Sequence, residues 1–180
     1  MDGGYGWLIV GISFYAVTLS MLVRFVFPVL LVVLLDEFGW SRTLLSGAFS
    51  LHLLAYGAVA PLLGVAFDRW NRRVLLGLGA IACGAAVASL QYVAEPIHLY
   101  VLYGVFGGIG ASALGLVPHA KIISQWFVRL RGIALGLTIS GVGVAMLLVP
   151  LLHAAMSALG WRAALVLFGV IIALTVFPLT

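Results

Sequence analysis

Uncharged segments of about 20 residues constrain this chain more than any other feature of its sequence. A bilayer core about 30 Å thick is crossed by about 20 helical residues, each of which rises about 1.5 Å. Between successive charged residues the chain carries six such apolar stretches, and the first is interrupted only by Arg24. The sequence therefore predicts an all-α membrane protein, a six-transmembrane-helix bundle that forms one domain over residues 1–180. The expected spans are 6–35, 43–68, 74–94, 97–126, 131–157 and 161–179.

The composition excludes a water-soluble fold. Hydrophobic residues make up 64% of the chain and charged residues only 8%, whereas soluble domains carry about 25% charge. Barrel strands would alternate apolar and polar side chains, but these stretches are apolar throughout. Nine basic residues cannot form a broad basic face, so the expected partner is the lipid bilayer and not nucleic acid. With the single Cys83 inside an apolar run and no metal-ligand spacing among four histidines, no disulfide, metal or cofactor is expected.

Arginines in the short connections predict the orientation of the bundle. The connections after the second and fourth spans carry five arginines, and those after the first and fifth carry two. Cytoplasmic loops are enriched in Lys and Arg, so the N-terminus is expected in the cytoplasm and the protein in the inner or plasma membrane. The five are Arg69, Arg72, Arg73, Arg129 and Arg131, and the two are Arg42 and Arg162.

Glycines recur inside the spans at intervals that suit close helix packing. Gly104 and Gly108 in the fourth span, and Gly132 and Gly136 in the fifth, have the G-x-x-x-G spacing that lets helix backbones approach in lipid. The alternative is that one glycine face lines a cavity or permits helices to slide.

Arg24 is the candidate substrate-binding residue that the sequence singles out most clearly. It lies about 16 Å of helix before the end of its apolar run at Leu35. Insertion scales give a central arginine a cost of about 2.5–3.5 kcal/mol, so Arg24 should face the bundle interior, a partner or a wet cavity. There its guanidinium can hold a carboxylate through two parallel hydrogen bonds. The alternative is that the side chain snorkels to the outer interface.

Two histidines and two prolines are further candidates. His52 in the second span and His119 in the fourth can contact substrate or relay protons, and the alternative for each is a hydrogen bond to a neighbouring helix. Pro28 in the first span and Pro118 in the fourth should break backbone hydrogen bonds, and such interruptions point toward a binding cavity. Lys121, near the inner mouth, is expected to snorkel to the surface, and the alternative is contact with substrate.

The connection after the second span contains a charged motif over residues 64–73, with the sequence Gly-Val-Ala-Phe-Asp-Arg-Trp-Asn-Arg-Arg. Gly64 lies one turn before Asp68 and leaves room for a partner helix, and Asn71 is expected at a left-handed turn position. The alternative is a simple arginine cluster that sets orientation. The motif resembles the signature loop of the major facilitator superfamily, G-x-x-x-D-R-x-G-R-R, with Asn71 in place of the internal glycine.

Two further segments narrow the resemblance to the monocarboxylate transporters. The stretch before the first span resembles their D-G-G-[WY]-G-W opening, and the stretch around the fifth span resembles their second signature. In the second signature a tryptophan replaces the usual tyrosine and Ala145 stands where a final glycine is expected. The matching residues are Asp2, Gly3, Gly4, Tyr5, Gly6 and Trp7 in the first, and Trp126, Phe127, Arg129, Arg131, Gly136 and Gly141 in the second.

The resemblance implies the N-terminal half of a major facilitator fold, which is a 3+3 inverted repeat. It implies secondary active transport of a small organic anion, a monocarboxylate, by proton symport or anion exchange with alternating access. The signature loop would act as a conformational latch, with Asp68 as the acid and Arg69, Arg72 and Arg73 as its basic partners. The expected protein partner is a missing C-terminal six-helix half or a second copy of the chain.

Two other functional classes are the alternatives to a carrier. A non-transporting membrane scaffold, interaction subunit or inactive half-carrier would keep Arg24 away from water. An enzyme is not expected, because the sequence shows no nucleophile–base pair, metal-ligand spacing or phosphate-binding glycine loop.

Overall fold

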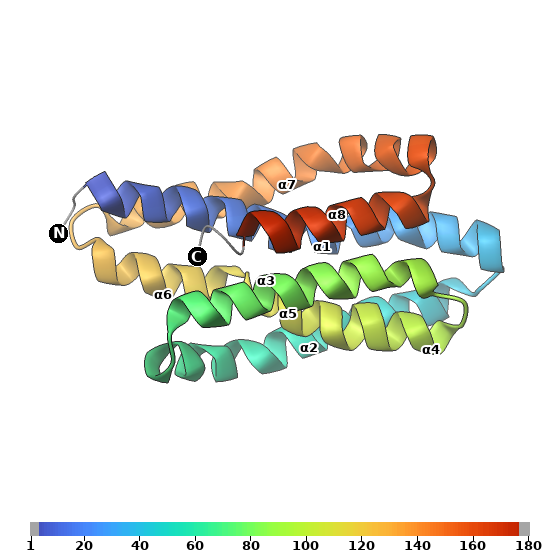
Figure 1. The fold of residues 1–180 in the computed structure, drawn as a ribbon, viewed down its shortest axis with the longest axis horizontal. Helices are drawn as coiled ribbons and strands as arrows, with labels where there is room; N and C mark the ends of the chain where they lie inside the picture. The colour runs from blue at the N-terminus through green and yellow to red at the C-terminus, as the bar shows by residue number, and fades with distance from the viewer. Residues whose placement is uncertain (1–3, 177–180) are drawn as a thin grey trace.

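The computed structural model describes residues 4–176, and this part of the chain is helical with no strand (Figure 1). The fourth crossing is composite, and each of the other crossings is built mainly on a single helix. The helices are α1 (Gly4–Phe38), α2 (Arg42–Arg69), α3 (Arg72–Ser89) with the 3-10 turn η1 (Leu90–Tyr92), α4 (Pro96–Leu99), the π-helical η2 (Tyr100–Gly107), α5 (Gly108–Ala113), α6 (Leu116–Trp126), α7 (Arg131–Leu159) and α8 (Trp161–Val176).

The helices confirm the predicted all-α membrane fold. Within the described residues, five crossings are long and apolar enough to span a bilayer, and α8 is apolar but only 16 residues long. The expected sixth span, 161–179, continues past Val176 and so lies partly outside the described residues. We call the end of the bundle that carries Arg72, Arg73, Arg129 and Arg131 the arginine-rich end; α1, α3 and α7 begin there (Figure 1).

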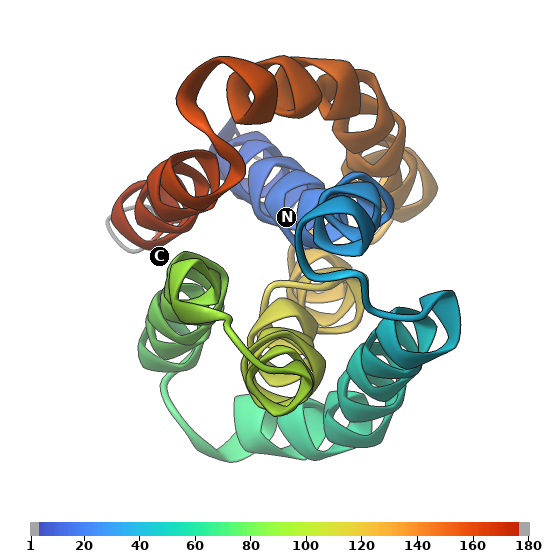
Figure 2. The ribbon, with the colours of Figure 1, turned by 90° about the vertical axis from the view of Figure 1, so that its right-hand side faces the viewer.

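Three of the main helix pairings are those that an inverted repeat would relate. α1 packs on α7, α2 packs on η2 and α5 of the fourth crossing, and α3 packs on α8. An inverted repeat relates the first, second and third crossings to the fourth, fifth and sixth. Under this exchange the α1–α7 pair corresponds to the pair of α2 with the fourth crossing, and the α3–α8 pair corresponds to itself. Figure 2, which looks along the bundle, shows α7 beside α1, α8 beside α3, and α2 beside the fourth crossing.

One of the two predicted glycine pairs forms a close helix contact. A Cβ added at Gly108 would lie 2.6 Å from the His52 carbonyl oxygen, and one at Gly104 would lie 3.0 Å from Leu51, so both glycines seat the fourth crossing on α2. A Cβ added at Gly132 or Gly136 would meet nothing within 4 Å among the described residues. Close packing is therefore confirmed for the pair in the fourth crossing only.

Two helices leave most of their apolar surface outside the bundle. The most apolar windows of α2 and α7 are 17% buried, whereas those of the other three long crossings are 56% buried. Leu54 and Leu62 on α2, and Leu147 and Leu151 on α7, are exposed. These faces need lipid or another protein to cover them.

At the opposite end of the bundle a polar cluster ties α1 to α8. Glu37 accepts hydrogen bonds from the Trp161 indole N–H and, at 2.7 Å, from Arg162. Arg162 also donates to the Gln91 carbonyl at 3.3 Å and lies over the Trp161 ring. The cluster joins three crossings at the start of the short helix α8.

Candidate functional site

Arg24 points from α1 toward α2. Its guanidinium carbon lies 3.9 Å from the centroid of the Tyr56 ring, a cation–π contact. The side chain is partly buried, and its Nε is buried without a hydrogen-bond partner among residues 4–176. Arg24 therefore meets an aromatic ring of the protein, and its Nε–H donor is left without a partner in the described part of the chain.

Tyr56 was not identified from the sequence, and it connects Arg24 to a break in the fourth crossing. The crossing leaves helical geometry at Leu114 and Gly115 before α6 begins. A Cβ added at Gly115 would lie 2.2 Å from the Tyr56 hydroxyl, so this hydroxyl lies against the N-terminus of α6. Helix N-termini carry free N–H groups and positive dipole ends, and broken helices in carriers direct them at anions.

The two candidate prolines lie in different settings. α1 continues through Pro28 as one helix, so Pro28 removes one backbone hydrogen bond without ending the helix. The fourth crossing does break, and Pro118 lies in the first turn of α6. Backbone N–H groups in a first turn have no acceptor within the helix, so proline costs no hydrogen bond there.

His52 lies close to Arg24 in the bundle but is fully enclosed. Its side chain is 0% exposed, its Nδ1 lies 3.0 Å from the Tyr103 carbonyl oxygen, and its ring stacks on that of Tyr103 at 4.5 Å. The Tyr103 hydroxyl donates in turn to the carbonyl of Val23, beside Arg24, at 3.4 Å. In this conformation His52 joins α2 to η2 and offers no surface to a ligand.

His119 lies apart from Arg24, toward the arginine-rich end. Its Nδ1 lies 3.0 Å from the Ser13 hydroxyl oxygen, and Ser13 precedes Arg24 on α1 by about 16 Å of helix. The structure therefore brings Arg24 and His52 into one region and does not bring His119 to it.

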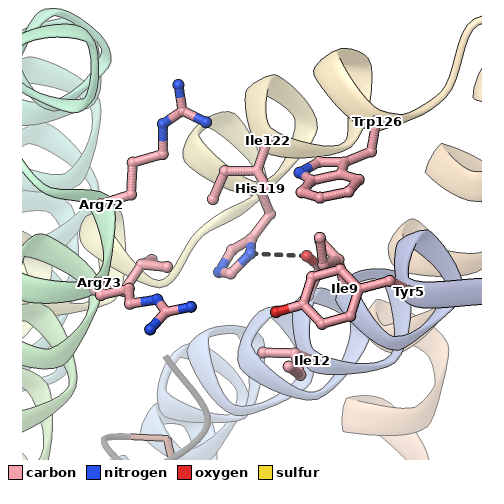
Figure 3. A pocket seen from close by; sticks show the side chains of 10 residues that line it. Tyr5, Ile9, Ile12, Arg72, Arg73, His119, Ile122 and Trp126 are labelled. Atoms are coloured by element: carbon pink, nitrogen blue, oxygen red, sulfur yellow. Dashed lines mark hydrogen bonds between the residues drawn. The ribbon is translucent and has the colours of Figure 1, made fainter. Parts of the chain in front are cut away.

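His119 instead lines a cavity of about 190 Å³ between α1, α3 and α6 (Figure 3). The walls combine basic, hydroxyl and apolar side chains, and no carboxylate is among the lining residues that the structure describes. The lining consists of Tyr5, Ile9, Ile12, Ser13, Arg72, Arg73, Leu76, His119, Ile122 and Trp126.

The signature loop differs in its pairing from what the sequence suggested. Asp68 pairs with Lys121 of α6, whose ammonium also donates to the Gly64 carbonyl at 2.9 Å, while Arg72 donates to Gln125. The structure thus gives Asp68 a lysine partner where Arg69, Arg72 and Arg73 were expected, and the partly exposed Lys121 is paired at the end of α2.

Asn71 also departs from expectation. Its φ is −65°, outside the left-handed region, and its side chain accepts from the Arg73 N–H at 3.0 Å. Asn71 therefore caps the N-terminus of α3, which explains why asparagine suits the position of the usual glycine.

We expect Lys121 and Asp68 to be energetically coupled but weakly. Both side chains are partly exposed, and such pairs contribute about 0.2–1 kcal/mol. Lys121→Met and Asp68→Asn should each lower the thermal stability in detergent slightly, and the double variant should lose no more than the larger single loss. Strictly additive losses in this double-mutant cycle would show that the pair does not form.

The two monocarboxylate-transporter-like segments pack on each other. The rings of Tyr5 and Trp126 lie 5.4 Å apart, those of Trp7 and Phe127 lie 5.1 Å apart, and a Cβ added at Gly6 would lie 2.9 Å from Phe127. They form the junction of α1 with the end of α6. Asp2 and Gly3 lie outside the described residues.

The remaining signature residues divide by burial. Gly141 seats α7 on α1, since an added Cβ would lie 2.6 Å from the Thr18 hydroxyl, while Gly136 faces open space. Arg129 and Arg131 are exposed. Across residues 4–176, no three His, Cys, Asp or Glu side chains are grouped to hold a metal ion.

Sequence comparison with known proteins points to one family of membrane carriers. A sequence profile of the major facilitator superfamily matches residues 13–180. Similar proteins include the uncharacterized MFS-type transporter YcxA of Bacillus subtilis (strain 168), 32% identical over 80% of this chain and 36% of its own length. Human monocarboxylate transporter 11 is 30% identical over 94% of this chain and 36% of its own length, and monocarboxylate transporter 2 of Mesocricetus auratus is 27% identical over 93% and 35%. The chain thus spans about a third of the length of these relatives.

Proposed function

Because the chain belongs to the major facilitator superfamily, a family of multi-pass membrane transporters, we propose that it forms the N-terminal half of a secondary carrier for small organic anions. A monocarboxylate is the proposed substrate, moved with a proton or exchanged for another anion. The proposed orientation places the arginine-rich end in the cytoplasm, in the inner or plasma membrane.

Arg24 is the observation that carries the proposal. A guanidinium within a membrane helix is costly and needs a compensating role. Here its Nε has no partner among the described residues, its face rests on Tyr56, and Tyr56 touches the N-terminus of α6. A carboxylate at this point would accept hydrogen bonds from the guanidinium and lie near a positive helix end.

The exposed faces of α2 and α7 support alternating access. Gly57 and Gly64 on α2, and Gly132, Gly136 and Gly143 on α7, have nothing within 4 Å of an added Cβ in the described chain. We propose that a second six-helix half, or a second copy of the chain, covers these faces and rocks against them. The loop around Asp68 would then act as the latch between the halves, releasing Lys121 when it engages the partner.

Uptake into proteoliposomes tests this function. The full-length protein should accumulate radiolabelled lactate or pyruvate above protein-free vesicles, and neutral analogues such as the methyl esters should not compete. An inward proton gradient that raises uptake indicates symport, and stimulation by internal carboxylate indicates exchange. Failure to transport or bind any small carboxylate would contradict the proposal and favour a scaffold role.

A further inference from the structure

The cavity lined by His119 carries positive charge from two signature-loop arginines that no acid of the described chain neutralises. Arg72 and Arg73 lie at its rim, at the start of α3, and neither pairs with a carboxylate among residues 4–176. Asp68, the acid of the signature loop, is paired with Lys121. The positive end of the α3 dipole adds to the field of the two guanidinium groups.

The inner end of the cavity is polar as well. Figure 3 shows Arg73, Tyr5 and His119 pointing into the same space. His119 is 1% exposed, and its Nε2 has no hydrogen-bond partner in the described chain. A buried nitrogen without a partner is costly, and an anionic oxygen that reached this depth would relieve that cost.

The remaining walls are apolar and lie where the membrane surface is expected. Ile9, Ile12 and Ile122 line the cavity, and Trp126 and Tyr5 flank it at the arginine-rich end. Trp and Tyr are typical of the level of lipid headgroups. A ligand that suits these walls has an anionic group next to an apolar body.

From this combination we propose that the cavity binds the phosphate group of an anionic phospholipid from the leaflet at the arginine-rich end. Guanidinium groups bind phosphate through paired hydrogen bonds, and basic pockets between transmembrane helices hold acidic headgroups. The cavity volume of about 190 Å³ leaves room for a phosphate and the adjoining glycerol. The site is distinct from Arg24 and does not depend on which anion the carrier moves.

Short-chain lipids titrated into the full-length protein in neutral detergent test the site. Native mass spectrometry should show one dihexanoyl-phosphatidylglycerol bound more tightly than dihexanoyl-phosphatidylcholine. Arg72→Gln with Arg73→Gln should weaken this binding by about 30-fold, because two guanidinium–phosphate contacts are lost. The matched control is Arg129→Gln with Arg131→Gln, which removes the same charge from exposed positions at the same end and should change binding little.

A variant that changes no charge distinguishes binding inside the cavity from nonspecific attraction of an acidic lipid to basic residues. Ile9→Trp fills the cavity without changing any charge and should also abolish the tight site, while the melting temperature without lipid shows whether the variant is folded. Equal loss in both arginine pairs, or unchanged binding in Ile9→Trp, would overturn the proposal. Binding of inorganic phosphate or glycerol 3-phosphate as tight as that of phosphatidylglycerol would overturn the lipid as the source of the phosphate.

Discussion

Replacing Gly169 with leucine should strongly destabilise the packing of α8 on α3. A Cβ at Gly169 would lie 2.4 Å from the Gly84 carbonyl oxygen and 2.7 Å from the Ala88 nitrogen, and a Cβ at Gly84 would lie 2.4 Å from the Gly169 carbonyl oxygen. The obstructing atoms belong to the backbone, which cannot rotate away. Overpacking of this kind costs about 1–3 kcal/mol or more, and here the two helices must separate.

The measurement is the melting temperature of the full-length protein in detergent, followed by fluorescence-detected gel filtration. Gly11→Leu is the matched control, because Gly11 is also in a helix but an added Cβ there meets nothing within 4 Å. Both changes raise helix propensity by a similar amount, so propensity cancels in the comparison. Gly169→Leu should melt well below the control or fail to fold. Equal melting temperatures would show that α3 and α8 are not in backbone contact.

The fold was predictable because a bilayer imposes a length and a polarity on each crossing. Charged residues mark the ends of the uncharged runs, and the helices begin and end close to them, as at Arg42, Arg72 and Arg131. The apolar runs do not indicate whether the helix inside each of them is regular or interrupted. The π-helix η2 and the break at Gly115 lie within a continuously apolar segment. Pro28 and Pro118 both lie inside apolar runs, but α1 continues through Pro28, whereas Pro118 lies just after the break in the fourth crossing.

The candidate site was predictable only in part, because its contacts are long-range. Arg24 stands out by its charge, but its orientation toward Tyr56 depends on the packing of α1 against α2. The pairing of Asp68 with Lys121 joins residues 53 positions apart and requires the angle at which α6 crosses α2. His119 was grouped with Arg24 on polarity, whereas the hydrogen bond to Ser13 fixes it nearer the arginine-rich end.

Removing the guanidinium of Arg24 should abolish carboxylate transport while leaving the protein folded. Hydrogen bonds to charged groups are worth about 1.5–3 kcal/mol each, so losing a bidentate pair predicts a fall in uptake of at least about a hundredfold in Arg24→Ala. The substitution also removes an insertion cost of about 2.5–3.5 kcal/mol, so misfolding is not the expected cause of the loss. The assay is the initial rate of lactate uptake in proteoliposomes, normalised to reconstituted protein.

Two further variants decide what Arg24 contributes. Arg24→Lys keeps the charge but loses the planar fork, so uptake should be intermediate and the apparent affinity reduced. Arg42→Ala removes an exposed arginine at the start of α2 and should leave uptake unchanged. If Arg24→Ala transports as fast as the unmodified protein, Arg24 is not in the binding site, and its contact with Tyr56 is only structural. A lysine variant as inactive as the alanine variant would instead indicate that the two parallel hydrogen bonds of the guanidinium, and not its charge, hold the substrate.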